Sequence, residues 1–404
     1  MCELTPISLT SLSRTHKRKD SILNNIKTQD KSNIPTCFSE ITSSWIRMVV
    51  NQFQIRRGLE PFEENEDLQI LKGVDCKHNA GKLSSVYLLT IQISDSYFHF
   101  VAKFLPPDDV SILEACSNNV FEKEISIYFD LLPAIKCHVS KSIVNLLPEV
   151  IYASHNQTGA GVIVFKSCVM DGFTTCEDPN GLNPQQLILT IKSLAKLHAF
   201  ASKFIEDATP EAVMERYDFL NLNLNVNKQF RKEESTNIDP ELESKFEDIV
   251  SVPHKEYFND KFLTIIHGEY WEPNLMFDEL NGMQILDWKH ARLGSGVFDL
   301  AFLLGTRVMD SNDINDYISL YFDAYVEACK MVGHTEGFTL EELHEEYANV
   351  SSHQANISIA RALKKEIKYL SNGNKSCRYQ EFKTRVELVL SRILINNSLF
   401  NQKK

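Results

Sequence analysis

The sequence lacks a spaced cysteine pattern, an excess of basic residues and a long apolar run, and each absence argues against a class of protein. Its 9 cysteines are an odd number without a Cys-x-x-Cys pair, which disfavours a disulfide framework or zinc site and favours a reducing, cytoplasmic location. The net charge of -12 argues against coating nucleic acid, because neutralising phosphates requires a basic face. No run is long and apolar enough to predict a membrane span, and no secretory signal is recognisable.

The 404 residues, 43% hydrophobic and 24% charged, are enough for two lobes. Residues 1–35 are rich in Ser, Thr and Lys, with a basic cluster at 16–19. This segment is interpreted as a flexible tail, with a nuclear or organelle address as the alternative.

A β-rich lobe is predicted over residues 36–165. Apolar residues between 41 and 53 recur at helical spacing. The strands that follow are expected at 68–71, 86–91, 98–104, 150–152 and 162–165. A helix over 120–132 carries Glu124 on its apolar face.

A mainly helical lobe is predicted over residues 166–404. Its helices are expected at 187–197, at 314–329, from a capping box beginning at Thr339, and at 379–393. The predicted class is therefore α+β and bilobal, a layout that can hold a nucleotide between lobes.

Two features of the first lobe suit a nucleotide. Lys103 on a strand and Glu124 on the next helix form a candidate phosphate-binding pair, with an exposed lysine and a solvated glutamate as the alternative. Gly81, Ser84 and Ser85 lie in a loop whose backbone N–H groups can cover phosphates, although many hairpin turns look the same.

The strongest pattern is a strand at 264–266, a polar loop at 267–274 and a hairpin over 275–286. Asn274 and Asp287 stand at the two bases of this hairpin. Amide and carboxylate oxygens suit Mg²⁺, so we expect a metal site here; the alternative is that both residues cap strand ends.

The polar loop also contains candidate catalytic residues. Glu269 is expected to receive the proton of an acceptor hydroxyl or to orient it, and His267 to brace the loop through a hydrogen bond, with Asp299 as a partner. Asp299 is otherwise an ordinary helix N-cap, and His198 is interpreted as a packing residue. The nearby aromatic residues line either a substrate pocket or the core: Tyr270, Trp271, Trp288 and Phe298.

These motifs resemble the ecdysteroid-kinase-like family of the aminoglycoside phosphotransferase and choline kinase superfamily. The resemblance rests on His267-Gly268-Glu269-x-Trp271-x-x-Asn274-Leu275-Met276-Phe277, then Asp287, then Val297-Phe298-Asp299-Leu300-Ala301. It extends to Val101-Ala102-Lys103, to the helix of Glu124, and over nearly everything from Trp45 onward. It implies a protein-kinase-like fold, ATP, Mg²⁺ and phosphorylation of small-molecule hydroxyls, with ecdysteroids as the best-known substrates.

The chain departs from the family pattern around the site. Glu269 replaces an aspartate, and the added methylene moves the carboxylate by roughly an ångström, which can cost about a hundredfold in rate. The hinge, which is the segment between the two predicted lobes, reads Lys166-Ser167-Cys168 where the family has Glu-Asp-Leu. The backbone groups of this hinge remain candidates for holding adenine. Lys289 stands where the family has glutamine, so it either assists phosphate binding or displaces metal; Pro273 stiffens the loop.

The motifs favour two functions and argue against a third. The first is an ATP- and Mg²⁺-dependent kinase, expected to be monomeric, that acts on a hydroxyl of a small apolar molecule such as a steroid. The second is a catalytically impaired nucleotide- or sterol-binding protein of the same fold, suggested by Glu269, Lys166 and Lys289. A protein kinase is disfavoured because Asp287 is not followed by Phe-Gly.

Overall fold

The structure is a computed structural model, and it describes residues 34–75, 85–105, 120–139, 146–156, 161–176, 178–220, 238–251, 259–307, 309–352, 354–372 and 377–402. The chain divides into two compact units. Unit 1 comprises Met1–Ala134 and Pro148–Asp171, and unit 2 comprises Ile135–Leu147 and Gly172–Lys404. The boundaries drawn from the sequence at 35 and 165 stay predictions.

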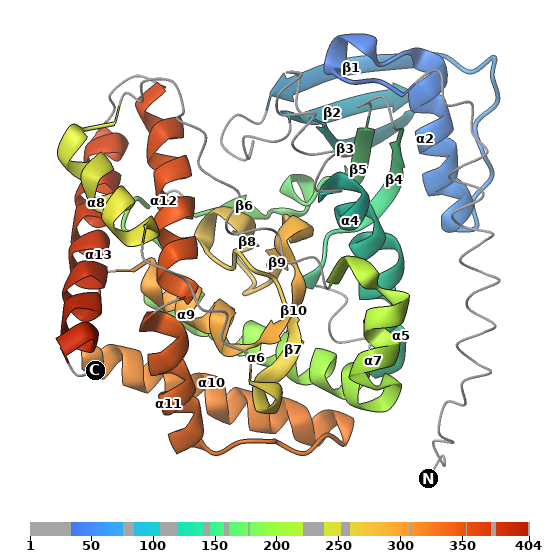
Figure 1. Cartoon of the computed structure of the whole chain (residues 1–404). Helices are drawn as coiled ribbons and strands as arrows, with labels where there is room; N and C mark the ends of the chain where they lie inside the picture. The colour runs from blue at the N-terminus through green and yellow to red at the C-terminus, as the bar shows by residue number, and fades with distance from the viewer. Residues whose placement is uncertain are drawn as a thin grey trace. The chain divides into compact units, whose positions relative to one another are not determined.

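Unit 1 is built on a five-stranded antiparallel sheet in the order β1-β2-β3-β5-β4 (Figure 1). Its strands are β1 (Leu68–Asp75), β2 (Ser85–Ile93), β3 (Ser96–Phe104), β4 (Val150–His155) and β5 (Gly161–Lys166). A short 3-10 turn, η1 (Phe38–Glu40), precedes the helix α2 (Ser43–Arg56). The predicted meander is confirmed.

The core of unit 1 lies between α2 and one face of the sheet. Thr42 caps α2 by accepting a hydrogen bond from the Trp45 N–H at 3.2 Å. Every second residue of β3 from Phe98 to Phe104 is buried, and these side chains pack with the apolar face of α2. The alternation that predicted the strand therefore also defines its core face.

The helix predicted over 120–132 is not uniform. It consists of α4 (Val120–Ser126), a π-helical turn η2 (Ile127–Leu131) and α5 (Leu132–Val139). The Leu132 N–H donates to the carbonyl of Ile127, five residues back. Pro133 follows and has no N–H to donate, so the regular hydrogen-bond pattern cannot continue through this point. The predicted single α-helix was wrong in this detail.

Unit 2 is mainly helical, as the sequence predicted. Its helices are α6 (Pro184–Ala208), α7 (Pro210–Arg216), α8 (Pro240–Val250), α9 (Val297–Gly305), α10 (Ser311–Val332), α11 (Leu340–Ser352), α12 (Gln354–Asn372) and α13 (Cys377–Gln402). Two small sheets accompany them: β10 (Arg292–Ser295) with β7 (Leu263–Ile266), and β6 (Thr174–Thr175) with β8 (Leu275–Phe277) and β9 (Met283–Ile285). The short turns are η4 (Val169–Asp171) at the end of unit 1, then η5 (Asp218–Leu220), η6 (Asp260–Phe262), η7 (Glu272–Asn274) and η8 (Trp288–His290).

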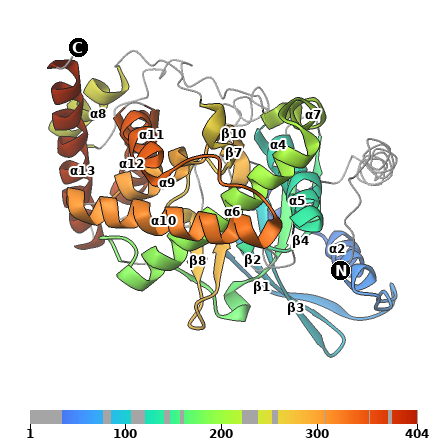
Figure 2. The ribbon, with the colours of Figure 1, turned by 90° about the horizontal axis from the view of Figure 1, so that it is seen from below.

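One long helix, α6, packs between a second long helix, α10, and the strand that leads into the polar loop. In Figures 1 and 2, α6 lies beside α10, and α6 also contacts β7. The predicted capping box of α11 is present, because the Thr339 N–H donates to the Glu342 carboxylate and the Glu342 N–H donates to the Thr339 hydroxyl.

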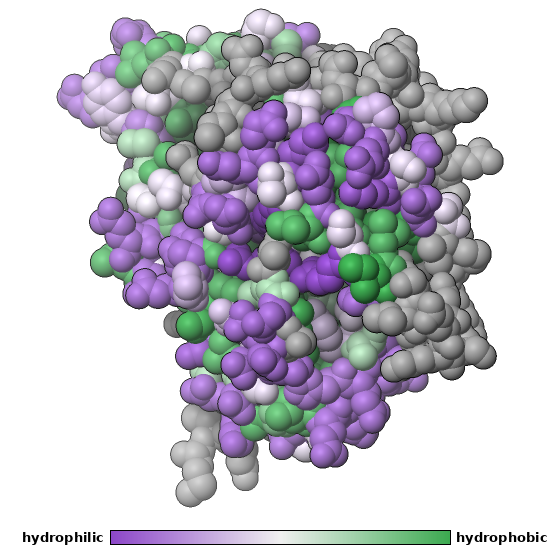
Figure 3. Space-filling model, turned by 90° about the vertical axis from the view of Figure 1, so that its left-hand side faces the viewer, coloured by the Kyte–Doolittle hydropathy of each residue, from purple (hydrophilic) through white to green (hydrophobic). Residues whose placement is uncertain are grey.

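Hydrophilic and apolar residues are interspersed on the face of the molecule shown in Figure 3. This mixture is ordinary for a solvated helical surface. None of the helices in the described part of the chain combines the length and the apolar character that crossing a bilayer requires.

Candidate active site

The hairpin of β8 and β9 brings Asn274 and Asp287 to neighbouring positions. Leu275 pairs with Ile285, and one step further the Leu286 N–H donates to the Asn274 carbonyl at 2.8 Å. Asn281 at the turn has a φ of 62°, which asparagine tolerates better than most residues. Asn274 thus directly precedes β8, and Asp287 directly follows Leu286, the residue that is hydrogen-bonded to Asn274.

Asp287 has a left-handed backbone, with φ 62° and ψ 58°. This conformation costs a residue with a Cβ roughly 1–2 kcal/mol, and such costs concentrate at functional sites. The Lys289 ammonium donates a hydrogen bond to Asp287 Oδ2. Lys289 is 7% exposed, so a buried cation is paired with the proposed metal ligand.

The side chain of Asp299 anchors the polar loop by binding two backbone N–H groups of the loop. The His267 N–H donates to Asp299 Oδ2 at 2.6 Å, and the Gly268 N–H donates to Oδ1 at 2.8 Å. Asp299 is the third residue of α9, whose N-cap position is Gly296, so the alternative of an ordinary N-cap was wrong.

His198 also contacts this carboxylate, with Nε2 lying 3.3 Å from Asp299 Oδ2. Its other ring nitrogen lies 2.8 Å from the Tyr321 hydroxyl, so two buried groups orient the ring. Burial alone would raise the pKa of Asp299, but His198 and the backbone donors outweigh it, and the pKa lies below the usual value.

The His267 ring has a different partner from its backbone. Nε2 lies 2.7 Å from the Leu286 carbonyl, next to the metal-ligand candidate Asp287, whereas only the His267 N–H reaches Asp299. The ring therefore connects the polar loop to the hairpin. The four aromatic residues of this region are buried and pack in the core of unit 2: Tyr270, Trp271, Trp288 and Phe298.

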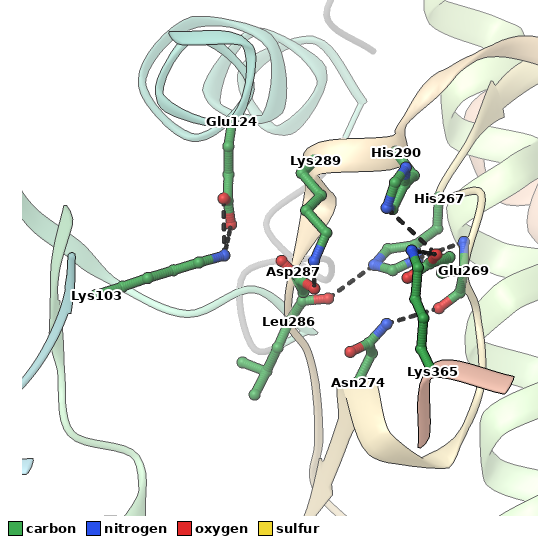
Figure 4. Close-up of polar contacts among 10 residues, drawn as sticks. All are labelled: Lys103, Glu124, His267, Glu269, Asn274, Leu286, Asp287, Lys289, His290 and Lys365. Carbon is green, nitrogen blue, oxygen red and sulfur yellow. Dashed lines mark hydrogen bonds and ion pairs between the residues drawn. The ribbon is translucent and has the colours of Figure 1, made fainter. Parts of the chain in front are cut away.

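Glu269 lies beside one histidine and one lysine side chain (Figure 4). Its Oε1 is 3.2 Å from His290 Nε2 and 3.9 Å from Lys365 Nζ. Burial opposes ionisation of Glu269, but the nearby positive charges outweigh this effect and lower its pKa. Burial lowers the pKa of His290 to about 3, so we treat His290 as neutral and assign the stabilisation of the carboxylate to the lysines.

Sequence reasoning missed Lys365, His290 and the contact of His198 with Asp299. His290 is three residues from Asp287, a proximity that could have drawn attention to it. Lys365 comes from α12, and nothing in its local pattern marks it as a neighbour of Glu269.

Unit 1 contains its own ion pair. Lys103 Nζ on β3 lies 2.8 Å from both carboxylate oxygens of Glu124 on α4 (Figure 4). The Lys103 side chain is 12% exposed and that of Glu124 is 2% exposed. A lysine held this way points in one direction, as a phosphate-binding lysine must.

The hinge candidates are engaged in local contacts. The Lys166 side chain pairs with Asp171 at 2.6 Å, and the Lys166 N–H donates to the Glu149 carbonyl. Cys168 is buried, which raises the pKa of its thiol to about 11. Ser85 is the first residue of β2, while Gly81 and Ser84 lie outside the described residues.

The oxygens at the hairpin bases fit a magnesium ion that shares its coordination with phosphates and water. Asn274 Nδ2 donates to the Glu269 carbonyl at 2.9 Å, which leaves the amide oxygen as the end that can face a cation. Asp287 supplies a carboxylate. Among the described residues no group of three or more His, Cys, Asp or Glu is arranged around a metal position.

An α+β fold with a buried lysine–glutamate pair in one unit and a braced polar loop in the other is typical of a kinase-like phosphotransferase. The ecdysteroid kinase-like family matches residues 81–259 and 233–334, and the chain belongs to this family. A comparison with curated proteins gave no match.

Solved structures of small-molecule kinases are also similar. An ethanolamine kinase from Plasmodium vivax is 14% identical, with a TM-score of 0.42 over 97% of this chain and 96% of that one. A choline kinase from Cryptosporidium parvum is 13% identical, with a TM-score of 0.40 over 95% and 97%. A choline kinase from Streptococcus pneumoniae is 12% identical, with a TM-score of 0.37 over 80% and 93%.

Proposed function

We propose that this protein transfers the terminal phosphoryl group of ATP to a hydroxyl of a small apolar molecule, with Mg²⁺ as the metal and steroids of the ecdysteroid kind as the candidate acceptors. The observation that carries the proposal is the connection between Asn274 and the polar loop. Its amide donates to the carbonyl of Glu269, so the proposed metal ligand and catalytic residue hold one another in place.

Each side chain has a role that follows from its contacts. Lys103, fixed by Glu124, neutralises phosphate charge. Glu269 orients the acceptor hydroxyl and receives its proton. Asp299 fixes the loop backbone on which Glu269 stands. The metal, when bound by Asn274 and Asp287, supplies positive charge at the phosphates.

The charge around Glu269 supports an uncharged acceptor. Lys365 and Lys289 lie near this carboxylate, and both would repel an acceptor carrying an ammonium group. A neutral alcohol meets no such penalty. We place the reaction in the cytoplasm and expect a monomer, as the sequence suggested.

A specific observation favours the second candidate, an impaired nucleotide- or sterol-binding protein. The Glu269 carboxylate is turned toward His290 and Lys365, which compete with an acceptor hydroxyl for the same oxygen. With the longer side chain at this position, binding can persist while transfer is lost.

Phosphate transfer tests the two candidates directly. The purified protein is incubated with radiolabelled ATP, Mg²⁺ and a pool of ecdysteroids, and phosphorylated products are separated by chromatography. We expect Mg²⁺-dependent transfer. Tight nucleotide binding without transfer, together with transfer by Glu269→Asp, would instead identify the impaired form.

The metal assignment needs its own test. Asp287→Ala is expected to abolish Mg²⁺-dependent nucleotide binding, measured by calorimetry. Asp278→Ala is the matched control, because it removes a carboxylate from the turn of the same hairpin, where Asp278 accepts the N–H of Leu280. If Asp287→Ala binds ATP with unchanged Mg²⁺ dependence, both candidate functions fail.

A further inference from the structure

Lys289 is placed by the same local turn that presents Asp287. The left-handed backbone at Asp287 leads into η8, where the fully buried Trp288 donates from its ring to the Ile285 carbonyl at 3.1 Å. This arrangement lets Lys289 fold back onto the aspartate (Figure 4). The contact is therefore built into the hairpin and its following turn.

The pair is shielded from solvent. The Lys289 side chain is 9% exposed and that of Asp287 is 18% exposed. A buried ammonium is strongly disfavoured without its counter-charge, so Lys289 cannot leave Asp287 without another anion to receive it. Lys289 also lies close enough to Glu269 to stabilise its negative charge.

This ammonium donates to one of the two carboxylate oxygens that Asp287 could offer to a metal ion. Kinase sites can bind two divalent ions, held by an aspartate and an asparagine, which neutralise the phosphates together. A divalent ion placed against the same aspartate oxygen as Lys289 would meet a fixed positive charge at contact distance. The ammonium and a second metal ion are thus alternatives for one position.

We propose that the Lys289 ammonium replaces one of two divalent ions, so that this protein binds its nucleotide with a single metal ion. The inference rests on the proposed function, because it requires the Asn274 and Asp287 pair to be the metal site. The remaining ion would be held by these two residues with phosphate oxygens and water. Lysine is suited to stand in place of a metal ion because the charge of its ammonium group is compact.

Counting bound metal tests this inference without measuring catalysis. Mn²⁺ is titrated into the protein in the presence of a non-hydrolysable ATP analogue, and free Mn²⁺ is followed by electron paramagnetic resonance. We expect one Mn²⁺ per chain for the wild type. Lys289→Gln, which restores the residue that the family resemblance places here, is expected to bind two.

Two further variants separate charge from position. Lys289→Arg keeps a cation beside Asp287 and is expected to bind one Mn²⁺. Lys365→Gln removes the other lysine near Glu269, which does not contact Asp287, and is also expected to bind one. Circular dichroism and thermal unfolding show that each variant is folded.

The outcomes are distinguishable. Two Mn²⁺ ions in the wild type, or a single ion in a folded Lys289→Gln protein, would overturn the inference and leave the proposed function standing. Failure of the wild type and of Lys289→Gln to bind the analogue with Mn²⁺ would overturn the proposed function, and the inference with it.

Discussion

Replacing Asp299 by asparagine is the sharpest test of how the polar loop is held. The carboxylate is fully buried and accepts the N–H groups of His267 and Gly268 at 2.6 and 2.8 Å. His198 lies 3.3 Å from the same group. Asparagine has nearly the same shape but no charge, and one of its two terminal atoms is a donor instead of an acceptor.

The magnitude follows from these contacts. A hydrogen bond to a charged group contributes about 1.5–3 kcal/mol, compared with about 1 kcal/mol for a neutral one. In Asp299→Asn one backbone N–H keeps a neutral acceptor, and the other faces an NH₂ group and loses its partner. We therefore expect the free energy of unfolding to fall by about 2–4 kcal/mol.

Urea denaturation followed by tryptophan fluorescence measures this loss, because Trp271 is buried within the loop and Trp288 is buried against His267. Asp278→Asn is the matched control. Asp278 also accepts two backbone N–H groups, from Leu280 and Gly282, but at a partly exposed turn, so its substitution is expected to cost less than about 1 kcal/mol. A loss in Asp299→Asn no larger than in this control would refute the reasoning.

Three further predictions concern the same unit. Because the pKa of Asp299 is lowered in the folded protein, the contribution of Asp299 to stability is complete above about pH 4. This contribution is lost as the pH falls through the folded-state pKa of Asp299. The denaturation curves of the wild type and of Asp299→Asn should therefore converge in acid. Gly268 has a φ of +88°, and Gly268→Ala would place a Cβ 2.5 Å from a backbone carbonyl oxygen. Gly333 has a φ of +65° but open space around it, so the melting temperature should fall further in Gly268→Ala than in Gly333→Ala. Equal losses in the two variants would contradict this. Arg385→Met removes the ion-pair partner of the buried Glu272 carboxylate, with the charge of Arg307 still nearby, and should cost about 3–5 kcal/mol in urea denaturation. Adding Glu272→Leu should recover part of this loss, because Arg385 also donates to the carbonyls of Thr306 and Pro179; a double variant no more stable than Arg385→Met would disprove the pairing.

The sequence alone predicted the elements that carry the proposed site. Apolar alternation located β3 and placed Lys103 on it, and the helical period of 120–132 placed Glu124 on a neighbouring helix. The hairpin of β8 and β9 followed from its turn residues, which put Asn274 and Asp287 at its two bases. These features depend on backbone geometry within short segments, so local patterns are enough to predict them.

The contacts that tune the site depend on tertiary packing. Lys365 approaches Glu269 only because α12 lies against the polar loop, and His198 reaches Asp299 from α6. The order of the strands in the sheet of unit 1 is not set by their order in the chain either, because β5 lies between β3 and β4. Segments distant in sequence meet because their apolar faces must share a core, and that choice depends on the shape of the whole unit.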